Sequence, residues 1–401
     1  MILPALATVA AAYAAFVGWC AWRVSRAPGA SGGAPGAPPR VAVLVAARDE
    51  EATIGRCLEA LLAQDYPAGR IEIVVADDHS TDETDAVVAR YVTREAVPER
   101  AGAFALAGEA PPAGRAPEAS VETAAARQRP RVRYVRVPDP TGHVRGKALA
   151  IHTAVEATDV PLLLVTDADC APPPGWARAL AADLQRGAAL TGGLTLMEER
   201  TATDTAQSLD WGFLLGVASA MTEAGFPATA MGNNLGFTRE AYEAVGGYPG
   251  LPFSVTEDYA LFKAIAEREG TDRVRFPIRP ASLVRTLPAR SLGHAYRQRR
   301  RWARGGMRAG PTVWAAYVLA HVAHLVPLVG LALAPLAGLG ALAVKLGADA
   351  LHLRAVLAKG GAGPLRLAPF LLFEGFLFLY MATLPAALLL APRIRWKGRR
   401  H

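Results

Sequence analysis

The chain has 401 residues, enough for two or three folding units, and 52% of them are hydrophobic, which is high for a soluble enzyme. Its formal net charge is +7, but basic residues concentrate in 285–308, where eight arginines and no acidic residue run directly into an apolar stretch. Nucleic-acid binding would require aromatic residues among the basic ones in a soluble domain, so we exclude nucleic acid. We expect this segment to meet lipid headgroups or phosphates.

Three apolar stretches are long enough to cross a bilayer, which takes about 20 residues. No charged side chain occurs in residues 2–22, and none occurs in 309–344 if its two histidines are counted as neutral. Residues 367–392 carry only one charged side chain, Glu374. The first stretch could be a cleaved signal peptide. Its positive charges follow the apolar run, however, which favours an anchor with the next domain in the cytoplasm. We therefore expect an integral protein of the inner (plasma) membrane.

The composition predicts a definite order of units along the chain. These are an N-terminal transmembrane anchor (1–26), a flexible Gly/Pro/Ala-rich linker (27–39), a cytoplasmic α/β domain (40–284) with a flexible insertion (97–130), a basic amphipathic interface segment (285–310), C-terminal transmembrane helices (311–392) and a basic tail (393–401).

The C-terminal part poses a problem of topology. We expect a hairpin of two spans within 309–344, an interfacial segment at 345–366 and a further span after it. A basic tail in the cytoplasm requires an even number of spans after the domain, whereas this count gives three. Either the last apolar stretch re-enters the membrane or Asp349 lies in a further span.

Within 40–284, apolar strands alternate with amphipathic helices, which predicts a Rossmann-like, doubly wound parallel sheet. We expect strands at 40–47, 71–76, 131–137, 162–167 and 190–197, and helices at 50–64, 148–157, 176–184, 204–222 and after Thr256.

Two aspartates follow the most apolar strand, in the sequence LLLVTDADC (162–170). Open α/β sheets bind ligands at the carboxyl ends of their strands, so we expect Asp167 and Asp169 to lie where a ligand would sit. Their hard oxygen donors suit Mg²⁺ or Mn²⁺. The alternative is a strand that ends in an ordinary turn.

Four features now stand in one order: Asp77 after the second strand, DAD at 167–169, TED at 256–258 and QRRRW at 298–302. This ordered set resembles the membrane-bound branch of the family 2 glycosyltransferases, which have a GT-A fold and D, DxD, TED and QxxRW motifs. The resemblance covers about residues 40–304. It implies a nucleotide-sugar-binding domain of the GT-A type.

The resemblance also implies how the donor would be bound. Asp77 would bind the base of a UDP- or GDP-sugar with Asp78 beside it, although Asp78 could instead cap the following helix. Lys147 resembles the family's Gly-Lys site near the nucleotide; the alternative is a solvated lysine at a helix start. Asp169, with Asp167 nearby, would hold a Mg²⁺ or Mn²⁺ ion that neutralises the diphosphate.

The TED match assigns the general base to Asp258, with Glu257 supporting or orienting it. Asn233 and Asn234 match the position where this family lines its acceptor pocket. The alternative for these two asparagines is a tight loop.

In the QxxRW match, Gln298, Arg301 and Trp302 contribute to donor binding and close the site at the membrane face, with Trp302 also near the acceptor. Four arginines that adjoin this motif are expected to face lipid headgroups: Arg299, Arg300, Arg304 and Arg308.

The resemblance therefore implies a metal-dependent, inverting glycosyltransferase that acts on a lipid-linked or membrane-proximal acceptor. A processive polysaccharide synthase would use the same motifs. A catalytically inactive nucleotide-sugar-binding assembly subunit is a second alternative, and it would be expected to lack the base or a metal ligand.

Overall fold

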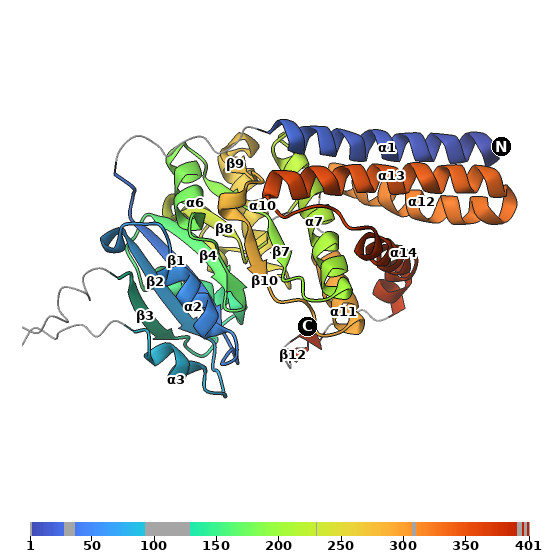
Figure 1. The fold of residues 1–401 in the computed structure, drawn as a ribbon. Coiled ribbons are helices and arrows are strands. Elements are labelled where there is room, and N and C mark those ends of the chain that lie inside the picture. Colours follow the sequence, from blue (N-terminus) through green and yellow to red (C-terminus); the bar gives the residue numbers. More distant parts are fainter. Residues whose placement is uncertain are drawn as a thin grey trace, which may run out of the picture.

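The computed structural model describes residues 2–27, 37–92, 129–229, 231–306 and 310–390, together with 395–396 and 399–400. Arg308 and most of the expected linker, insertion and basic tail lie outside the described residues. The described residues form a mixed α/β domain, and long apolar helices extend from one side of it (Figure 1).

The main sheet has seven strands in the order β3-β2-β1-β4-β8-β6-β9. β8 runs antiparallel to its neighbours β4 and β6, and the other pairings are parallel. Its strands are β1 (Val41–Ala47), β2 (Ile71–Asp77), β3 (Arg131–Arg136), β4 (Leu162–Asp167), β6 (Leu190–Gly192), β8 (Leu235–Thr238) and β9 (Val274–Arg275).

Alternation along β1 explains why helices cover both faces of this sheet. Its odd-numbered residues pack with α2 (Ile54–Leu62) and α6 (Trp176–Gln185). Its even-numbered residues Ala42 and Leu44 pack with α5 (Lys147–Glu156) and α10 (Glu257–Glu269). Successive side chains of a strand point to opposite faces, so a strand that is apolar throughout is buried on both.

The expected single strand at 190–197 is wrong. β6 stays in the main sheet, whereas β7 (Thr195–Met197) joins a second sheet with β5 (Cys170–Ala171) and β10 (Val284–Thr286). Gly192 and Gly193 lie at the change of sheet. A Cβ on Gly193 would lie 2.7 Å from the Asn234 side chain, so the chain turns where no side chain fits.

α7 (Ala202–Thr222) confirms the helix expected at 204–222 and links the domain to the apolar helices. It begins with a capping box, in which Thr201 and Asp204 each accept a hydrogen bond from the other's backbone N–H. β7 packs against it from the domain, and α1, α13 and α14 pack against it from the apolar side. The shorter elements are η1 (Ala68–Arg70), α3 (Thr84–Ala89), α8 (Arg239–Ala244), α9 (Gly247–Gly250), η2 (Thr271–Arg273), η3 (Pro280–Ser282), β11 (Arg395–Trp396) and β12 (Arg399–Arg400).

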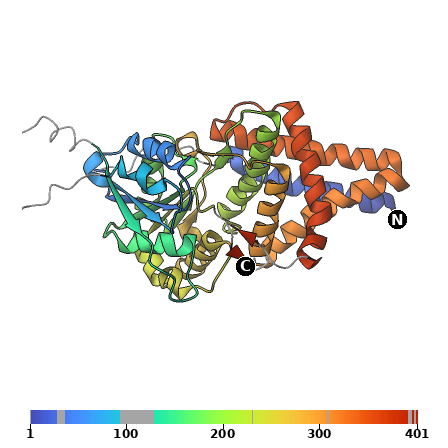
Figure 2. The ribbon, with the colours of Figure 1, turned by 90° about the horizontal axis from the view of Figure 1, so that it is seen from below.

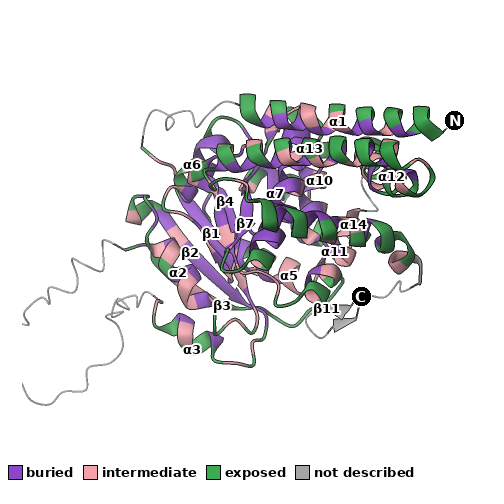
Figure 3. Ribbon diagram, turned by 45° about the vertical axis from the view of Figure 1, so that its right-hand side comes forward, coloured by how far each residue is buried: buried purple, intermediate pink, exposed green. Residues whose placement is uncertain are grey.

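Among the described residues, four long helices are apolar enough to cross a membrane, which indicates membrane association. α1 (Ile2–Arg26), α12 (Pro311–Leu333) and α13 (Pro335–Gly360) lie side by side, with largely exposed outer faces on α1 and α13 (Figures 1 and 3). α14 (Leu367–Leu390) crosses them (Figure 2). The interfacial segment expected at 345–366 is wrong, because α13 continues through it to Gly360.

A cluster of polar side chains is buried where these helices meet. Lys345 Nζ lies 2.9 Å from Asp349 Oδ2 on the same helix and forms an ion pair with Glu374 of α14. The Tyr13 hydroxyl of α1 donates to Asp349 Oδ1 at 2.8 Å. His324 brings a potential ligand atom within 4.8 Å of both carboxylates, but the Lys345 ammonium already supplies their cation. This Lys345 cluster holds α14 against α13.

Candidate active site

The candidate site lies at the edge of the sheet where β1, β2 and β4 end. Asp77 and Asp167 are the last residues of β2 and β4, and they are in register with Ala47 and Ala46 of the intervening β1. Because neighbouring strands lie about 4.8 Å apart, the backbones of the two aspartates are separated by about 10 Å. The parallel sheet therefore brings the first two sequence features to one edge.

Asp77 and Asp78 are held by side chains from neighbouring elements. Asp77 is buried, and its Oδ2 accepts a hydrogen bond from the Tyr134 hydroxyl at 2.7 Å. Asp78 is also buried and pairs with Arg48 in the loop after β1, at 3.3 Å. The N–H of Thr84, the first residue of α3, donates to Asp82 Oδ1 at 3.0 Å, so Asp82 supplies a side-chain acceptor at the start of this helix.

Lys147 lies among acidic side chains at the centre of the site. It begins α5, and its ammonium forms an ion pair with Asp167 and lies 3.9 Å from Glu257 Oε1. Burial alone would lower the pKa of Lys147, but the carboxylates of Asp167, Glu257 and Asp258 outweigh burial and raise it. The alternative of a solvated lysine is therefore wrong, and its role in donor binding stays a prediction.

Asp169 lies in a surplus of negative charge. Burial and then the neighbouring Asp167 raise the pKa of Asp169 to about 6. Arg56 Nη2 donates to the backbone carbonyl of Asp169 at 2.5 Å, while the Lys147 ammonium pairs with Asp167. Two hard carboxylates whose ionised forms disfavour each other suit a divalent cation.

Asp258 is oriented by the backbone around it. The N–H of Gly232 donates to its Oδ2 and the N–H of Tyr259 to its Oδ1, each at 2.8 Å. A Cβ on Gly232 would lie 2.9 Å from Asp258 Cβ and 3.2 Å from Lys147 Nζ, so this close approach requires glycine. Burial and then the adjacent Asp258 raise the pKa of Glu257. The two carboxyl groups of TED thus lie in one site with Lys147.

The QRRRW residues lie on α11 (Leu292–Gly306). Arg301 Nη1 donates to the Val255 carbonyl at 3.0 Å, which ties α11 to the start of α10. The Trp302 ring packs edge-on against Trp211 of α7, with 5.0 Å between ring centroids. Gln298 is half-buried on the same helix. The roles of these three residues in binding stay predictions.

The expectation that Arg299 faces lipid is wrong. Arg299 is buried, and its Nε lies 2.7 Å from Oδ2 of the buried Asp210 on α7. Asp210 also accepts a hydrogen bond from the Tyr380 hydroxyl of α14 at 3.3 Å. The guanidinium carbon of Arg299 lies 4.3 Å from the Trp302 ring centroid. Arg299 therefore positions Trp302, a role that sequence reasoning missed because its partners are distant in sequence.

Asn233 and Asn234 are both buried and neither lines the cavity that borders Asp258, so their role in acceptor binding stays a prediction. Asn234 is fully buried; its Oδ1 accepts from Trp176 Nε1, and its Nδ2 donates to two backbone carbonyls, all at 2.9 Å. Asn233 is buried as well, and its Oδ1 accepts from the Thr195 hydroxyl at 3.0 Å. The two asparagines support the loop that presents Gly232 to Asp258.

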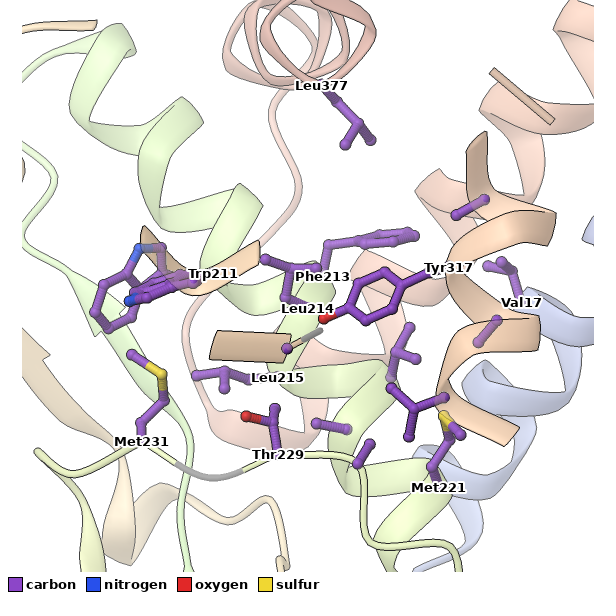
Figure 4. Close-up of a pocket in the computed structure, with 18 of the residues that line it drawn as sticks. Val17, Trp211, Phe213, Leu214, Leu215, Met221, Thr229, Met231, Tyr317 and Leu377 are labelled. Carbon is purple, nitrogen blue, oxygen red and sulfur yellow. The ribbon is translucent and has the colours of Figure 1, made fainter. Parts of the chain in front are cut away.

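An apolar cavity of about 170 Å³ borders Asp258 and extends among the long helices (Figure 4). Residues of α1, α7, α12 and α14 form most of its lining, which also includes Trp211 and Trp302. Sequence reasoning missed Trp211, because an aromatic residue within an apolar helix carries no local signal of a binding role. The cavity joins the proposed base to the membrane-associated part of the molecule.

Comparisons with known proteins agree with this architecture. The model of the glycosyl transferase family group 2 matches residues 162–392, more than half of the chain, and the model of glycosyl transferase family 2 matches residues 42–99. The chain is similar to the mannosyltransferase PcManGT from Pyrobaculum calidifontis, solved in complex with GDP-Man and Mn²⁺. That similarity covers 97% of this chain and 99% of the other, with a TM-score of 0.59 at 21% identity, and shows a shared fold.

Curated relatives match over a shorter segment. The beta-monoglucosyldiacylglycerol synthase of Synechocystis sp. is 46% identical over 50 residues, which is 12% of this chain and 10% of that protein. The probable glycosyltransferase YdaM of Bacillus subtilis is 40% identical over 53 residues, 13% of each chain. The alignments thus span about a tenth of the length of these relatives.

Proposed function

Since the chain belongs to glycosyltransferase family 2, we propose that it is an inverting enzyme that moves a sugar from a UDP- or GDP-sugar to a lipid-linked or membrane-proximal acceptor. The observation that carries this proposal is the cavity that joins Asp258 to the space among α1, α7, α12 and α14. An acceptor held in a bilayer could reach the base through this cavity without leaving the lipid phase. One of the similar proteins is named for the synthesis of a glucosyl lipid.

The donor would lie along the edge of the sheet. Its base would meet Asp77 and Asp78, and its diphosphate would lie near Lys147 and Arg301, with Gln298 and Trp302 completing the site on α11. Arginine suits this role because its planar guanidinium matches phosphate oxygens.

Asp169 and Asp167 would hold a Mg²⁺ or Mn²⁺ ion. Such an ion stabilises the negative charge that grows on a diphosphate as the glycosidic bond breaks. Support comes from the two hard oxygen donors and from the raised pKa of Asp169, because replacing a proton by a divalent cation relieves the repulsion between the carboxylates. The similar mannosyltransferase was solved with Mn²⁺.

Asp258 would act as general base. Its carboxylate takes the proton of the acceptor hydroxyl as that oxygen bonds to the anomeric carbon and the nucleoside diphosphate leaves. The N–H groups of Gly232 and Tyr259 fix the orientation of the carboxylate before the acceptor arrives. A single displacement inverts the anomeric centre. Glu257, which also lies near Lys147, would help to hold that lysine in place.

We infer that the catalytic domain and the basic tail lie on the cytoplasmic side of the membrane. α12 and α13 form a hairpin beside α1, and α14 crosses that bundle instead of extending it (Figures 1 and 2). With α12 and α13 as the spans after the domain, the chain returns to the side of the domain. That arrangement satisfies the even number of spans that the basic tail requires.

The test is nucleotide release by the detergent-solubilised full chain, using a panel of UDP- and GDP-sugars with Mn²⁺, with and without total membrane lipid. We expect one donor to be turned over, stimulation by lipid, and loss of that stimulation in the Asp258→Asn variant. Tight donor binding without release from any donor would contradict a transferase. Products that lengthen with time after one initiation would indicate a processive synthase.

A further inference from the structure

Among the described residues that line the cavity beside Asp258, two buried polar atoms, Trp211 Nε1 and His324 Nε2, have no hydrogen-bond partner, and the proposed reaction uses neither. The indole Nε1–H of Trp211 is buried and has no hydrogen-bond partner among the described residues, and Trp211 lines the cavity. A buried donor without a partner is unfavourable, because it has lost its hydrogen bonds to water and gained none in the protein. An oxygen of a bound ligand would satisfy it.

The surrounding side chains hold this indole in a fixed position. Trp302 packs edge-on against it, and the Arg299 guanidinium lies against the other indole, Trp302. Arg299 is itself fixed by Asp210, which directly precedes Trp211 on α7. Tyr380 of α14 donates to the same Asp210. Side chains from α7, α11 and α14 thus fix the position of the Trp211 N–H group before a ligand binds.

The charge of the lining limits the chemistry of that ligand. Among the described residues that line the cavity, Asp258 carries the one charged side chain, and no lysine or arginine is present. The nearby Arg299 lies outside this lining and forms an ion pair with Asp210, and its Nη1 has no hydrogen-bond partner among the described residues. An anionic headgroup would therefore meet a carboxylate without a matching cation, whereas an uncharged headgroup would not.

We propose that the cavity binds an uncharged amphiphile that carries a hydroxyl next to a second oxygen function, and that Trp211 Nε1–H donates a hydrogen bond to this second oxygen. The hydroxyl faces Asp258, and the apolar chain lies among α1, α7, α12 and α14. This inference rests on the proposed function for the role of the hydroxyl. To that function it adds that the acceptor is uncharged and that Trp211 recognises it.

The first experiment measures lipid binding in the absence of donor. Detergent-solubilised full-length protein is titrated with radiolabelled dioleoylglycerol and, separately, with dioleoyl phosphatidic acid, which has the same chains but a phosphate. We expect dioleoylglycerol to bind more tightly. We expect Trp211→Phe, which keeps an aromatic ring but removes the N–H, to weaken that binding about tenfold. Trp314→Phe is the matched control, since Trp314 is 42% exposed and lies outside the cavity lining.

A second experiment changes the ligand, so that its result does not depend on whether the Trp211→Phe variant folds as well as wild type. Oleyl alcohol has the hydroxyl and a chain but lacks the second oxygen. The wild-type protein should prefer dioleoylglycerol to oleyl alcohol, and Trp211→Phe should lose most of that preference. Equal binding of dioleoylglycerol by wild type and Trp211→Phe, or tighter binding of phosphatidic acid than of dioleoylglycerol, would overturn the proposal.

The outcomes separate this inference from the proposed function. Transfer to a lipid acceptor that does not depend on Trp211 would leave the transferase function and remove the recognition role. Binding of dioleoylglycerol that depends on Trp211, without turnover of any donor, would leave the lipid site and remove the catalytic proposal.

Discussion

Two regions of this molecule each place one lysine among carboxylates from separate helices or strands, and they differ in exposure. In the candidate site, the side chains of Lys147 and Asp167 are 28% and 33% exposed. In the Lys345 cluster, those of Lys345, Asp349 and Glu374 are 1%, 0% and 4% exposed. The same residue types therefore serve different purposes. The open group can exchange its partners for a ligand, and the sealed group can only hold helices together.

The two regions also differ in the number of carboxylates that surround each lysine. Lys147 lies among Asp167, Glu257 and Asp258, and Asp169 adds a further carboxylate beside Asp167. The site therefore has a surplus of negative charge that a cation or a proton must relieve, which suits it to metal-assisted binding of a diphosphate. The Lys345 cluster has a smaller surplus of negative charge. The Tyr13 hydroxyl helps to stabilise that charge by donating a hydrogen bond to Asp349.

The largest effect is expected in the open site, from Asp258→Asn. The amide keeps the shape of the side chain but cannot accept the acceptor's proton, so kcat should fall by about 10²–10⁴-fold. Donor binding, measured by titration calorimetry, should persist because Asp258 is assigned to the acceptor. A variant that loses activity only by losing donor affinity would show that this carboxylate belongs to the donor site.

The sealed cluster should respond in stability. Lys345→Met leaves two buried carboxylates without their cation, so the free energy of unfolding should fall by about 3–5 kcal/mol. Thermal unfolding in detergent measures this loss. The control combines Lys345→Met with Asp349→Leu and Glu374→Leu, which removes all three charges and should recover most of the stability. Lys147→Met should unfold close to wild type and instead raise KM for the donor.

A smaller effect is expected from crowding the open site with Gly232→Ala. The new Cβ would lie 2.9 Å from Asp258 Cβ, so the carboxylate must move away from its backbone donor. We expect kcat to fall by about tenfold, comparable with the cost of overpacking by one methyl group. Gly69→Ala is the control, because nothing lies within 4 Å of its added Cβ. Unchanged kcat in Gly232→Ala would mean that Asp258 does not need this orientation.

The smallest effect is the pH dependence of stability through Glu257. Burial and then Asp258 raise the pKa of Glu257, so the folded state favours the protonated form. This contribution to stability is present below the ordinary pKa of 4.5 and is lost as pH rises through the raised value. Glu257→Gln lacks this loss, so its Tm relative to wild type should increase from pH 4.5 upward. An exposed glutamate of α8, changed in Glu240→Gln, gives the baseline.

The sequence predicted the open site better than the sealed one, for a physical reason. Asp77 and Asp167 follow apolar strands, and parallel strands end at one edge, so local pattern was enough to place them. Lys345 and Asp349 made 345–366 look interfacial because each charge was considered alone. Their partner Glu374 lies on another helix, and the pairing allows α13 to continue.

The same limit applies to α11 and to the loop that contains Gly232, because the partners of their side chains lie far away in sequence. Arg299 was expected at the lipid surface because the chain gives no sign of its pairing with Asp210, 89 positions earlier. Asn233 and Asn234 were expected to line the acceptor pocket from motif position, but the carbonyls that occupy Asn234 come from distant segments. The environment of these residues depends on contacts with residues that are distant in sequence, and a single sequence does not show those contacts.

If the acceptor reaches Asp258 through the cavity between the apolar helices, a bulky side chain that fills the cavity should block transfer to lipid. Ala316 of α12 lines the cavity, whereas its neighbour Ala315 is exposed and lies outside the lining. We would measure transfer of labelled sugar into organic-extractable product, alongside donor binding, for Ala316→Phe and Ala315→Phe. We expect Ala316→Phe to lose lipid transfer and keep donor binding, and Ala315→Phe to behave as wild type. Undiminished lipid transfer by Ala316→Phe would rule out this route for the acceptor.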